Sequence, residues 1–312
     1  MNNKIIVVAG PTASGKTALS VKIAKELGGE IVSCDSMQIY KGIDIGTAKP
    51  SLEERCGVPH HMIDIISPDE KYNVVSYKRD AEAAIDDILK RGRVPVLAGG
   101  TGLYMDSVLS NTAFSENSSF SVARERLEKL FEEKGREYIF EMLEKIDPEA
   151  AEKIHPNNTR RVIRALEIYE TTGKTLTQAN IESKRPEKYE SLVIGLMWDR
   201  ETLYERINER VERMMAEGLL KEVETLRKKG MKAEYTSMQA IGYKELFEYF
   251  EGNCTLEEAK EKIKQESRRY AKRQMTWLKR NKKINWLILQ KDYNLNKIYE
   301  QSFTLIKKFG IM

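Results

Sequence analysis

The segment IIVVAGPTASGKTALS, residues 5–20, contains the residue pattern of a phosphate-binding loop. Gly10, Gly15, Lys16 and Thr17 follow the spacing G-x-x-x-x-G-K-[ST]. In such a loop, successive backbone N–H groups and the positive end of the following helix point at anionic oxygens. The lysine adds a mobile charge, and the threonine adds a hydroxyl suited to Mg²⁺. The sequence therefore predicts a phosphate site, and leaves open whether a phosphoryl group is transferred or discarded.

Two further polar residues follow apolar runs, at positions where ligands of an open parallel sheet collect. Asp35 follows the run 31–34 and is interpreted as a metal-directed carboxylate, a general base or the cap of a turn. Thr101, between two glycines, either reaches the same cleft or belongs to a simple glycine-rich turn. An ordinary NTPase carries a second carboxylate for Mg²⁺ at a strand end, and the run ending in AGGTGLY has no acid.

Histidine and cysteine give little indication of a metal site. His60 and His61 are adjacent, so their side chains point apart in regular structure, and packing or turn roles are expected. Cys34, Cys56 and Cys254 are widely spaced, which argues against zinc and disulfides and favours a reducing compartment. A strand is expected from the fifth residue, which leaves no room for a signal peptide, and no apolar stretch is long enough to cross a bilayer. We expect a cytoplasmic protein with no membrane partner.

Apolar runs and helical patterns alternate in the first third of the chain. The runs Ile5–Ala9, Ile31–Cys34 and Val94–Ala98 are separated by amphipathic helical segments. Strand, helix and strand at this spacing predict parallel strands joined by helical crossovers. The fold class is therefore α/β, a doubly wound parallel sheet like that of P-loop NTPases.

The middle of the chain reads as an insertion into this core. Helical periodicity without strand signals begins at about Phe114, and the apolar run Leu192–Met197 is interpreted as a strand that rejoins the sheet. We expect a first part of the core at 1–113, a helical insertion at 114–187 and completion of the core with basic C-terminal helices at 188–312. The expected elements of the last part are helices at Glu201–Lys229, Met238–Phe250 and Leu256–Lys279 and a strand at INWLIL.

Basic residues are concentrated on predicted helices, although the formal net charge of the 312 residues is only +4. One cluster contains Arg160, Arg161 and Arg164, and the other contains Arg268, Arg269, Lys272 and Arg273 with Tyr270 and Trp277 interleaved. A single charge run is usually a solvated face, whereas two clusters on separate helical units favour a polyanion that contacts both. A third group, Arg200, Arg206 and Arg210, either joins this surface or faces the phosphates.

Over nearly its whole length the chain resembles the tRNA dimethylallyltransferases. The strings that carry the resemblance are GPTASGKT, DSMQIYKGIDIGTAKP, GVPHHMIDI, GGTGLY, NNTRRVIRALEIY, MQAIGYKEL and SRRYAKRQMTWLKR. The resemblance implies transfer of a dimethylallyl group from its diphosphate to the exocyclic amine of the adenosine immediately 3′ to a tRNA anticodon. Diphosphate is then the leaving group, so the loop would hold phosphates in order to release them.

The resemblance also implies roles for individual residues. The expected diphosphate-binding residues are Gly10, Pro11, Thr12, Ala13, Ser14, Gly15, Lys16, Thr17 and Arg206, with Mg²⁺ held by Thr17. Lys16 would stabilise the charge of the leaving group, and Asp35 would accept the proton of the amine. Thr101 would hold the amine or a bridging oxygen in line. Ser36, Met37 and Gln38 would line the slot for the extruded base, where the amide of Gln38 can pair with adenine.

The expected macromolecular partner is the anticodon stem-loop of tRNA, and the expected state of the protein is a monomer. The expected tRNA-binding residues are Asp35, Ser36, Met37, Gln38, Thr101, Arg124, Thr159, Arg160, Arg161, Val162, Ile163, Arg164, Arg268, Arg269 and Arg273. Three alternatives remain at this point: a small-molecule kinase, a prenyltransferase for free adenine nucleotides and a non-catalytic RNA-binding NTPase. A kinase would share the loop and Asp35 without needing the insertion or the basic C-terminal helix.

Overall fold

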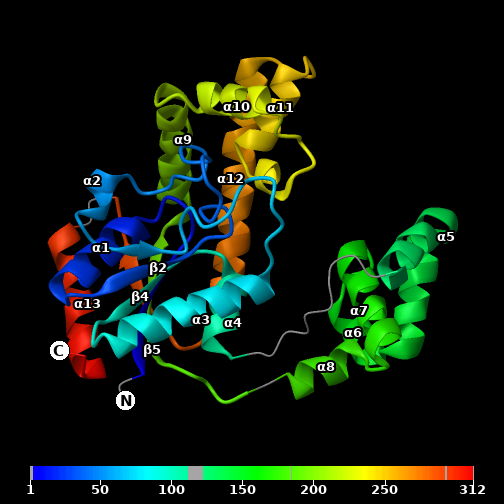
Figure 1. The fold of residues 1–312 in the computed structure, drawn as a ribbon, viewed down its shortest axis with the longest axis horizontal. Helices are drawn as coiled ribbons and strands as arrows, with labels where there is room; N and C mark the ends of the chain where they lie inside the picture. Colours follow the sequence, from blue (N-terminus) through cyan, green and yellow to red (C-terminus); the bar gives the residue numbers. More distant parts are fainter. Residues whose placement is uncertain (1–2, 112–121, 184, 292–293, 312) are drawn as a thin grey trace. The chain divides into compact units, whose positions relative to one another are not determined.

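The computed structural model describes residues 3–111, 122–183, 185–291 and 294–311, and it divides into two compact units (Figure 1). The first unit contains Met1–Leu109 and Glu187–Met312, and the second contains Ser110–Pro186. The boundary that the sequence predicts at about Phe114 lies outside the described residues. Among the described residues, no helix combines the length and the apolar character that a bilayer-spanning segment needs.

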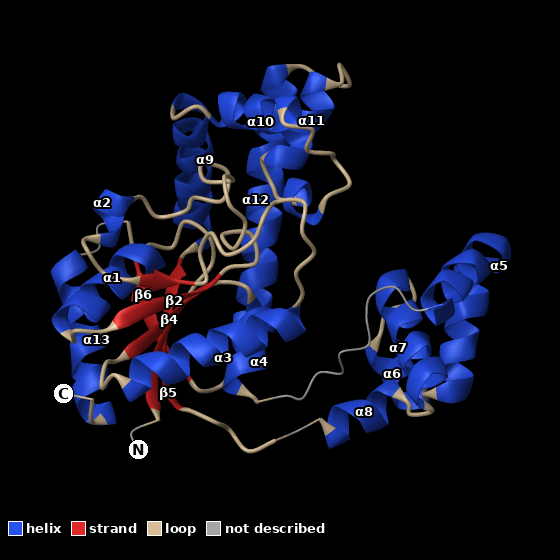
Figure 2. Ribbon diagram, in the orientation of Figure 1, coloured by secondary structure: helices blue, strands red, loops and turns tan. Residues whose placement is uncertain are grey.

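Six parallel strands form the sheet of the first unit (Figure 2), so the predicted α/β class is confirmed. The strand order is β3-β2-β4-β1-β5-β6. Their bounds are β1 Lys4–Ala9, β2 Glu30–Cys34, β3 His60–His61, β4 Pro95–Gly99, β5 Glu190–Trp198 and β6 Ile284–Leu289. The short β3 was not predicted, because two histidines carry no apolar run.

Helices cover both faces of this sheet. The bounds of the covering helices are α1 Lys16–Glu26, α3 Val74–Lys90, α4 Gly102–Leu109 and α13 Leu295–Phe309. Ile6 and Val8 of β1 belong to the core shared with α1 and α13, whereas Ile5 and Val7 belong to the core shared with α3 and α4. Strands buried on both faces read as continuous apolar runs, and such runs predicted β1, β2 and β4.

Four further helices extend from the sheet and enclose a third core (Figure 1). Their bounds are α9 Arg200–Ala216, α10 Leu219–Lys228, α11 Tyr243–Phe250 and α12 Leu256–Leu278; α2, Leu52–Arg55, is a single turn elsewhere in the unit. The single helix predicted over Glu201–Lys229 is wrong, because Gly218, with φ +103°, ends one helix and begins the next. The helix predicted over Met238–Phe250 is likewise a 3₁₀ turn, Thr236–Gln239, followed by α11.

The second unit is helical throughout its described residues. Its helices are α5 Val122–Ile146, α6 Pro148–Lys153, α7 Thr159–Thr172 and α8 Leu176–Glu182. Gly135 has non-helical angles inside α5, so this span consists of two successive helices. Asp147 caps α6, where its carboxylate accepts the backbone N–H of Ala150 at 3.1 Å.

A buried carboxylate, that of Glu30, is hydrogen-bonded to several side chains at the edge of the sheet where β2 and β3 begin. The side chain of Glu30 is 3 % exposed and accepts hydrogen bonds from Arg91, from Arg93 at 2.8 Å and from the imidazole of His61 at 2.7 Å. Hydrogen bonds from Arg91 lower the pKa of Glu30 to about 2, against the opposing effect of burial, and His61 and Arg93 contribute further. His61 lies in a strand, and its imidazole serves this hydrogen-bond network at the edge of the sheet.

Replacement of Glu30 by glutamine should therefore destabilise the protein most at neutral pH. Hydrogen bonds to a charged group contribute about 1.5–3 kcal/mol, so we expect Glu30→Gln to lower the free energy of unfolding by about that amount at pH 7. The folded-state pKa is depressed, so the wild-type advantage is complete above the ordinary value of 4.5 and disappears as the pH falls towards about 2.

Urea denaturation of wild type and variant between pH 7 and pH 3 measures this difference. Glu26→Gln on the exposed face of α1, where Glu26 pairs with Lys22, is the matched control and should have little effect. Equal stability losses for Glu30→Gln at pH 7 and pH 3 would show that the ionised carboxylate is not the stabilising form.

Candidate functional site

The phosphate loop lies between the end of β1 and the start of α1, the context that its sequence pattern requires. Its backbone is fixed by donors from β5 and α9. The indole N–H of Trp198 donates to the carbonyl of Ser14 at 3.0 Å, and Nε of Arg206 donates to the carbonyl of Ala13 at 3.0 Å. The guanidinium of Arg206 also lies 4.5 Å from the centre of the Trp198 ring. Arg206, predicted to bind diphosphate, therefore lies against the loop.

Several polar groups of the loop remain available for an anion. The hydroxyl of Ser14 is buried and has no hydrogen-bond partner among the described residues. Nζ of Lys16 donates to the carbonyl of Pro11 at 3.3 Å, and no carboxylate in the described part of the chain forms an ion pair with it. Burial, together with the nearby charge of Arg210, lowers the pKa of Lys16 to about 8, although Asp35 opposes the shift. A bound anion would stabilise this buried ammonium.

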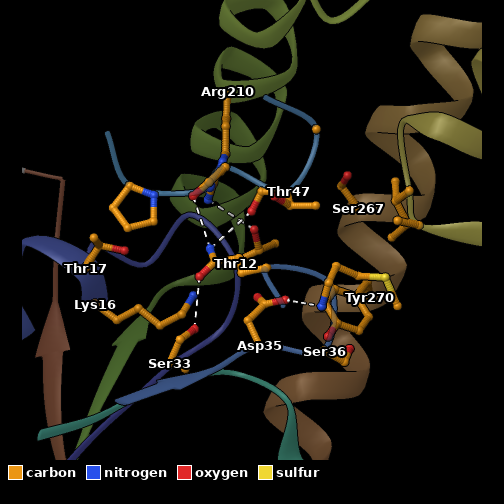
Figure 3. A pocket seen from close by; sticks show the side chains of 18 of the residues that line it. Thr12, Lys16, Thr17, Ser33, Asp35, Ser36, Thr47, Arg210, Ser267 and Tyr270 are labelled. Atoms are coloured by element: carbon orange, nitrogen blue, oxygen red, sulfur yellow. Dashed lines mark hydrogen bonds between the residues drawn. The ribbon is translucent and has the colours of Figure 1, made fainter. Parts of the chain in front are cut away.

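Figure 3 shows Lys16, Thr17, Asp35, Arg210 and Tyr270 around a cavity of about 300 Å³. The cavity is also lined by hydrocarbon side chains, which come from α9 and α12: Ile207, Val211, Met214 and Ile263. On its other side the loop borders a wider basin of about 1260 Å³, lined by Ala13, Ser14, Gly15, Lys22 and Arg206. The cavity thus combines a phosphate-binding end with a carboxylate and an apolar wall.

Asp35 and Thr101 belong to adjoining turns at the ends of β2 and β4. A carboxylate oxygen of Asp35 accepts the backbone N–H of Met37 at 2.9 Å, and the carboxylate lines the cavity. The hydroxyl of Thr101 accepts the backbone N–H of Ser36 at 3.2 Å and is hydrogen-bonded to Tyr270. Asp35, Ser36 and Met37 line the cavity, whereas Thr101 supports them from behind, outside the lining.

The amide of Gln38 is engaged by the protein at both ends. Its oxygen accepts the hydroxyl of Ser33 at 3.0 Å, and its nitrogen donates to the carbonyls of Thr47 at 3.3 Å and Ala48 at 3.2 Å. The resemblance implied that this amide pairs with adenine, but in the structure its nitrogen donates to the neighbouring loop and its oxygen accepts from Ser33 of β2. Gln38 contributes to the cavity wall by holding that loop.

The loop that Gln38 holds is also fixed by Glu222 of α10. The carboxylate of Glu222 accepts the backbone N–H groups of Asp44, Ile45 and Gly46 at 3.0, 2.9 and 3.3 Å and the hydroxyl of Tyr243 at 2.5 Å. Sequence reasoning did not identify this residue, because its partners lie far away along the chain.

The first basic cluster, on α7 of the second unit, has exposed and half-buried members. Arg160 and Arg161 are exposed, whereas Arg164 pairs with the buried Glu167 at 2.8 Å. Arg124 pairs with Glu128 at 2.9 Å and lies 4.0 Å from Glu167, and Thr159 begins the helix half-buried.

Two of the expected RNA contacts on this helix need correction. Val162 and Ile163 are 1 % and 4 % exposed and belong to the core of the second unit. Their side chains hold α7 against its neighbours and do not reach its surface. The helical period places Arg160 and Arg161 on the outside and these two residues on the inside.

The second basic cluster lies on α12. Arg269 and Arg273 are exposed, whereas Arg268 donates to the side chain of Asn208 on α9 at 2.6 Å. Trp277 and Tyr270, interpreted from the sequence as part of an RNA surface, contact other parts of the unit: Tyr270 is hydrogen-bonded to Thr101 after β4, and the Trp277 indole donates to Asp106 of α4 at 2.8 Å. The third basic group was expected either to join the RNA surface or to face the phosphates. Arg210 donates to the hydroxyl of Thr12 in the phosphate loop at 3.2 Å, so this residue faces the phosphate site. Arg200 lies over the ring of Tyr204.

Sequence reasoning missed two residues that line the cavity. Tyr270 was noted only within a basic cluster, and Gln274 was not noted. Burial, and then the charge of Asp35, raises the pKa of Tyr270 to about 12, so its hydroxyl stays protonated at neutral pH. Gln274 contacts the phosphate loop and the turn after β4. The available signal was the spacing of Tyr270, Gln274 and Trp277, which places all three on one face of a helix.

Comparison with known proteins finds one matching family and relatives whose names describe the same kind of transferase. Residues 38–281 match the family described as IPP transferase. A tRNA dimethylallyltransferase of Carboxydothermus hydrogenoformans is 50% identical over 97% of this chain and 97% of that protein, and one of Bacillus subtilis is 48% identical over 98% of each. A crystal structure of a tRNA isopentenylpyrophosphate transferase from Bacillus halodurans is 44% identical, with a TM-score of 0.75 over 98% of this chain and 96% of that one.

A more distant structure extends the comparison. It belongs to a eukaryotic dimethylallyltransferase acting on tRNA, with 31% identity and a TM-score of 0.84 over 98% of this chain and 80% of that one. Sequence and fold agree over almost the full length of the chain. The chain therefore belongs to the IPP transferase family.

Proposed function

We propose that the protein transfers the dimethylallyl group of dimethylallyl diphosphate to the exocyclic amine of the adenosine immediately 3′ to a tRNA anticodon, with release of diphosphate. The family and the names of the relatives support this class of reaction. The observation that carries the proposal is the common cavity, which is lined by Lys16 and Thr17 of the phosphate loop, by Asp35 and by hydrocarbon side chains. The loop residues suit a diphosphate, Asp35 can serve as a proton acceptor, and the apolar side chains suit a five-carbon chain.

The reaction breaks the allylic C–O bond and forms a C–N bond. Negative charge develops on diphosphate as the C–O bond breaks, and the loop N–H groups with the Lys16 ammonium stabilise it; one such donor is typically worth about 3 kcal/mol. The aromatic amine attacks the allylic carbon and must lose a proton. Asp35 accepts that proton in the proposal, while Thr101 and Tyr270 hold the adjoining turn in place.

Residues around the loop fit a Mg²⁺ ion bound together with diphosphate. Thr17 offers a hydroxyl at the start of α1, and the orphaned hydroxyl of Ser14 lies in the same loop. Within the described residues, no cluster of three His, Cys, Asp or Glu could hold a metal alone. Mg²⁺ usually keeps waters and binds through few protein groups plus substrate phosphates, so Thr17 would be its protein ligand, where the ion would neutralise diphosphate charge.

Each of the two units carries its own exposed cations for the proposed RNA contacts. Arg160 and Arg161 on α7 are exposed cations of the second unit, and Arg269 and Arg273 on α12 are exposed cations of the first. Such side chains suit the phosphates of an anticodon stem-loop. A tRNA substrate places the reaction in the cytoplasm, and since one chain supplies all of the proposed groups, the active form is proposed to be a monomer.

The first test concerns the proton acceptor. Asp35→Asn preserves the shape of the side chain and removes its basicity, so the single-turnover rate with saturating substrates should fall by 10²–10⁴. Pyrophosphate affinity should change less than threefold, because the loop supplies those contacts. Rates are measured over a range of Mg²⁺ concentrations. A variant with nearly the full rate, or one whose rate is restored by excess Mg²⁺, would rule out the base assignment.

The second test concerns the charge of Lys16. Its pKa of about 8 means that the free protein loses this charge as the pH rises through 8, so pyrophosphate binding above that pH must first protonate the amine. We expect the inhibition constant of pyrophosphate against dimethylallyl diphosphate to weaken by up to tenfold per pH unit above 8. Lys16→Arg stays charged and serves as the control for the ionisation of pyrophosphate itself. Parallel pH profiles for the two proteins would contradict the prediction.

The third test concerns RNA. Double charge reversal at Arg160 and Arg161 should weaken tRNA binding, and each lost phosphate contact should reduce the slope of log affinity against log salt by roughly 0.7–0.9. Binding is measured by filter retention of labelled tRNA at several salt concentrations. Lys153→Glu, an exposed cation on α6 of the same unit, is the control. Unchanged tRNA affinity of the double variant at low salt would remove α7 from the RNA surface.

A further inference from the structure

Helix α12 presents one row of side chains to the loops at the strand ends. Tyr270 is hydrogen-bonded to Thr101, Gln274 contacts the phosphate loop and Trp277 donates to Asp106 at 2.8 Å. A Cβ atom on Gly102 would lie 2.2 Å from the Trp277 ring, so this helix packs directly on the start of α4. The row connects α12 to both loops that surround the cavity.

Gln274 is the member of this row that joins the two loops to each other. Its side-chain oxygen accepts the backbone N–H of Thr12 at 2.9 Å, and its side-chain nitrogen donates to the carbonyl of Gly100 at 3.0 Å. Thr12 follows β1 within the phosphate loop, and Gly100 follows β4 and precedes Thr101. The residue is 6 % exposed, so water does not readily replace either bond.

The chemistry of the two partners fixes the identity of this side chain. The N–H of Thr12 can only donate and the carbonyl of Gly100 can only accept, so the bridging group must offer one acceptor and one donor. A neutral amide meets this condition, whereas a carboxylate lacks the donor and a hydrocarbon lacks both. The fit is close, because a Cβ atom on Gly100 would lie 2.4 Å from the amide nitrogen of Gln274 and 2.7 Å from the carbonyl of Gly10.

We propose that Gln274 is a positioning residue that sets the distance between the phosphate loop and the Thr101 turn, and thereby aligns the leaving group with the acceptor base. This inference rests on the proposed function. Thr12 belongs to the loop that holds diphosphate, while Thr101 supports the turn of Asp35 and Ser36 that faces the base. A change of about 1 Å in such an alignment can cost on the order of 10²-fold in rate without loss of binding.

Two substitutions test the role. Gln274→Met keeps the length of the side chain and removes both hydrogen bonds, so the single-turnover rate at saturating substrates should fall at least tenfold at every pH. The rate of Gln274→Glu should fall similarly at pH 8, because its carboxylate then faces the carbonyl of Gly100 and cannot donate to it. At pH 6 a protonated carboxyl group can donate to that carbonyl and accept from Thr12, so its rate relative to wild type should recover several-fold.

The ratio to wild type at each pH cancels the titration of other groups near the cavity. The other charged or ionisable groups that line the cavity are Lys16 on α1, Asp35 after β2, His60 on β3, Arg210 on α9, and Tyr270 and Arg273 on α12. Gln265→Met and Gln265→Glu, on an exposed position of the same helix, are the matched controls and should keep the wild-type rate and pH profile. The dissociation constant of pyrophosphate should stay within threefold of wild type in all four variants.

Several outcomes would overturn the positioning role. It is wrong if Gln274→Met keeps a rate within twofold of wild type, or if the loss in Gln274→Glu does not depend on pH. A loss of pyrophosphate binding or of thermal stability that parallels the loss of rate would assign the amide to folding alone. A wild-type protein that prenylates no tRNA would contradict the proposed function instead, so the two failures are distinguishable.

Discussion

In-register pairing of three parallel strands is the constraint on which the site depends. Ala9 of β1 pairs with Gly99 of β4, and Gly99 pairs with Cys34 of β2, so the three strands end at the same level. A Cβ atom on Gly99 would lie 2.1 Å from the carbonyl of Cys34, and the close packing there requires glycine. The segments that follow, namely the phosphate loop, Asp35 and the Thr101 turn, must therefore emerge side by side.

Helix α12 makes this arrangement rigid and also carries charge. One face bonds to the strand-end loops through Tyr270 and Gln274 and to α4 through Trp277, while Arg269 and Arg273 project from exposed positions. A single amphipathic helix thus serves both the alignment of the cavity and the basic surface of the first unit. The same division occurs on α7 of the second unit, where the buried face supplies the core and the exposed face supplies cations.

The charges at the cavity are arranged for an anion that the protein itself does not supply. Lys16 and Arg210 are both half-buried, and the pKa of each is lowered chiefly by burial of its charged group, with a neighbouring cation adding to the effect. The negative charge of Asp35 raises both pKa values, but it offsets the lowering only in part. Unpaired cations in a desolvated site gain most when a multivalent anion binds, which favours diphosphate over a neutral ligand and lets the loop's N–H groups act with little reorganisation.

The sequence by itself determined the features that contiguous residues encode: the phosphate loop, the apolar strands β1, β2 and β4, the helical insertion and the basic stretches. It did not determine that Gly218 divides a predicted helix, since helical period alone cannot decide whether packing tolerates a glycine. Nor did it show that Val162 and Ile163 are buried or that Gln38 and Gln274 bond to distant loops. Those facts depend on partners such as Gly100, 174 residues from Gln274, and only the folded chain brings such groups within hydrogen-bonding distance.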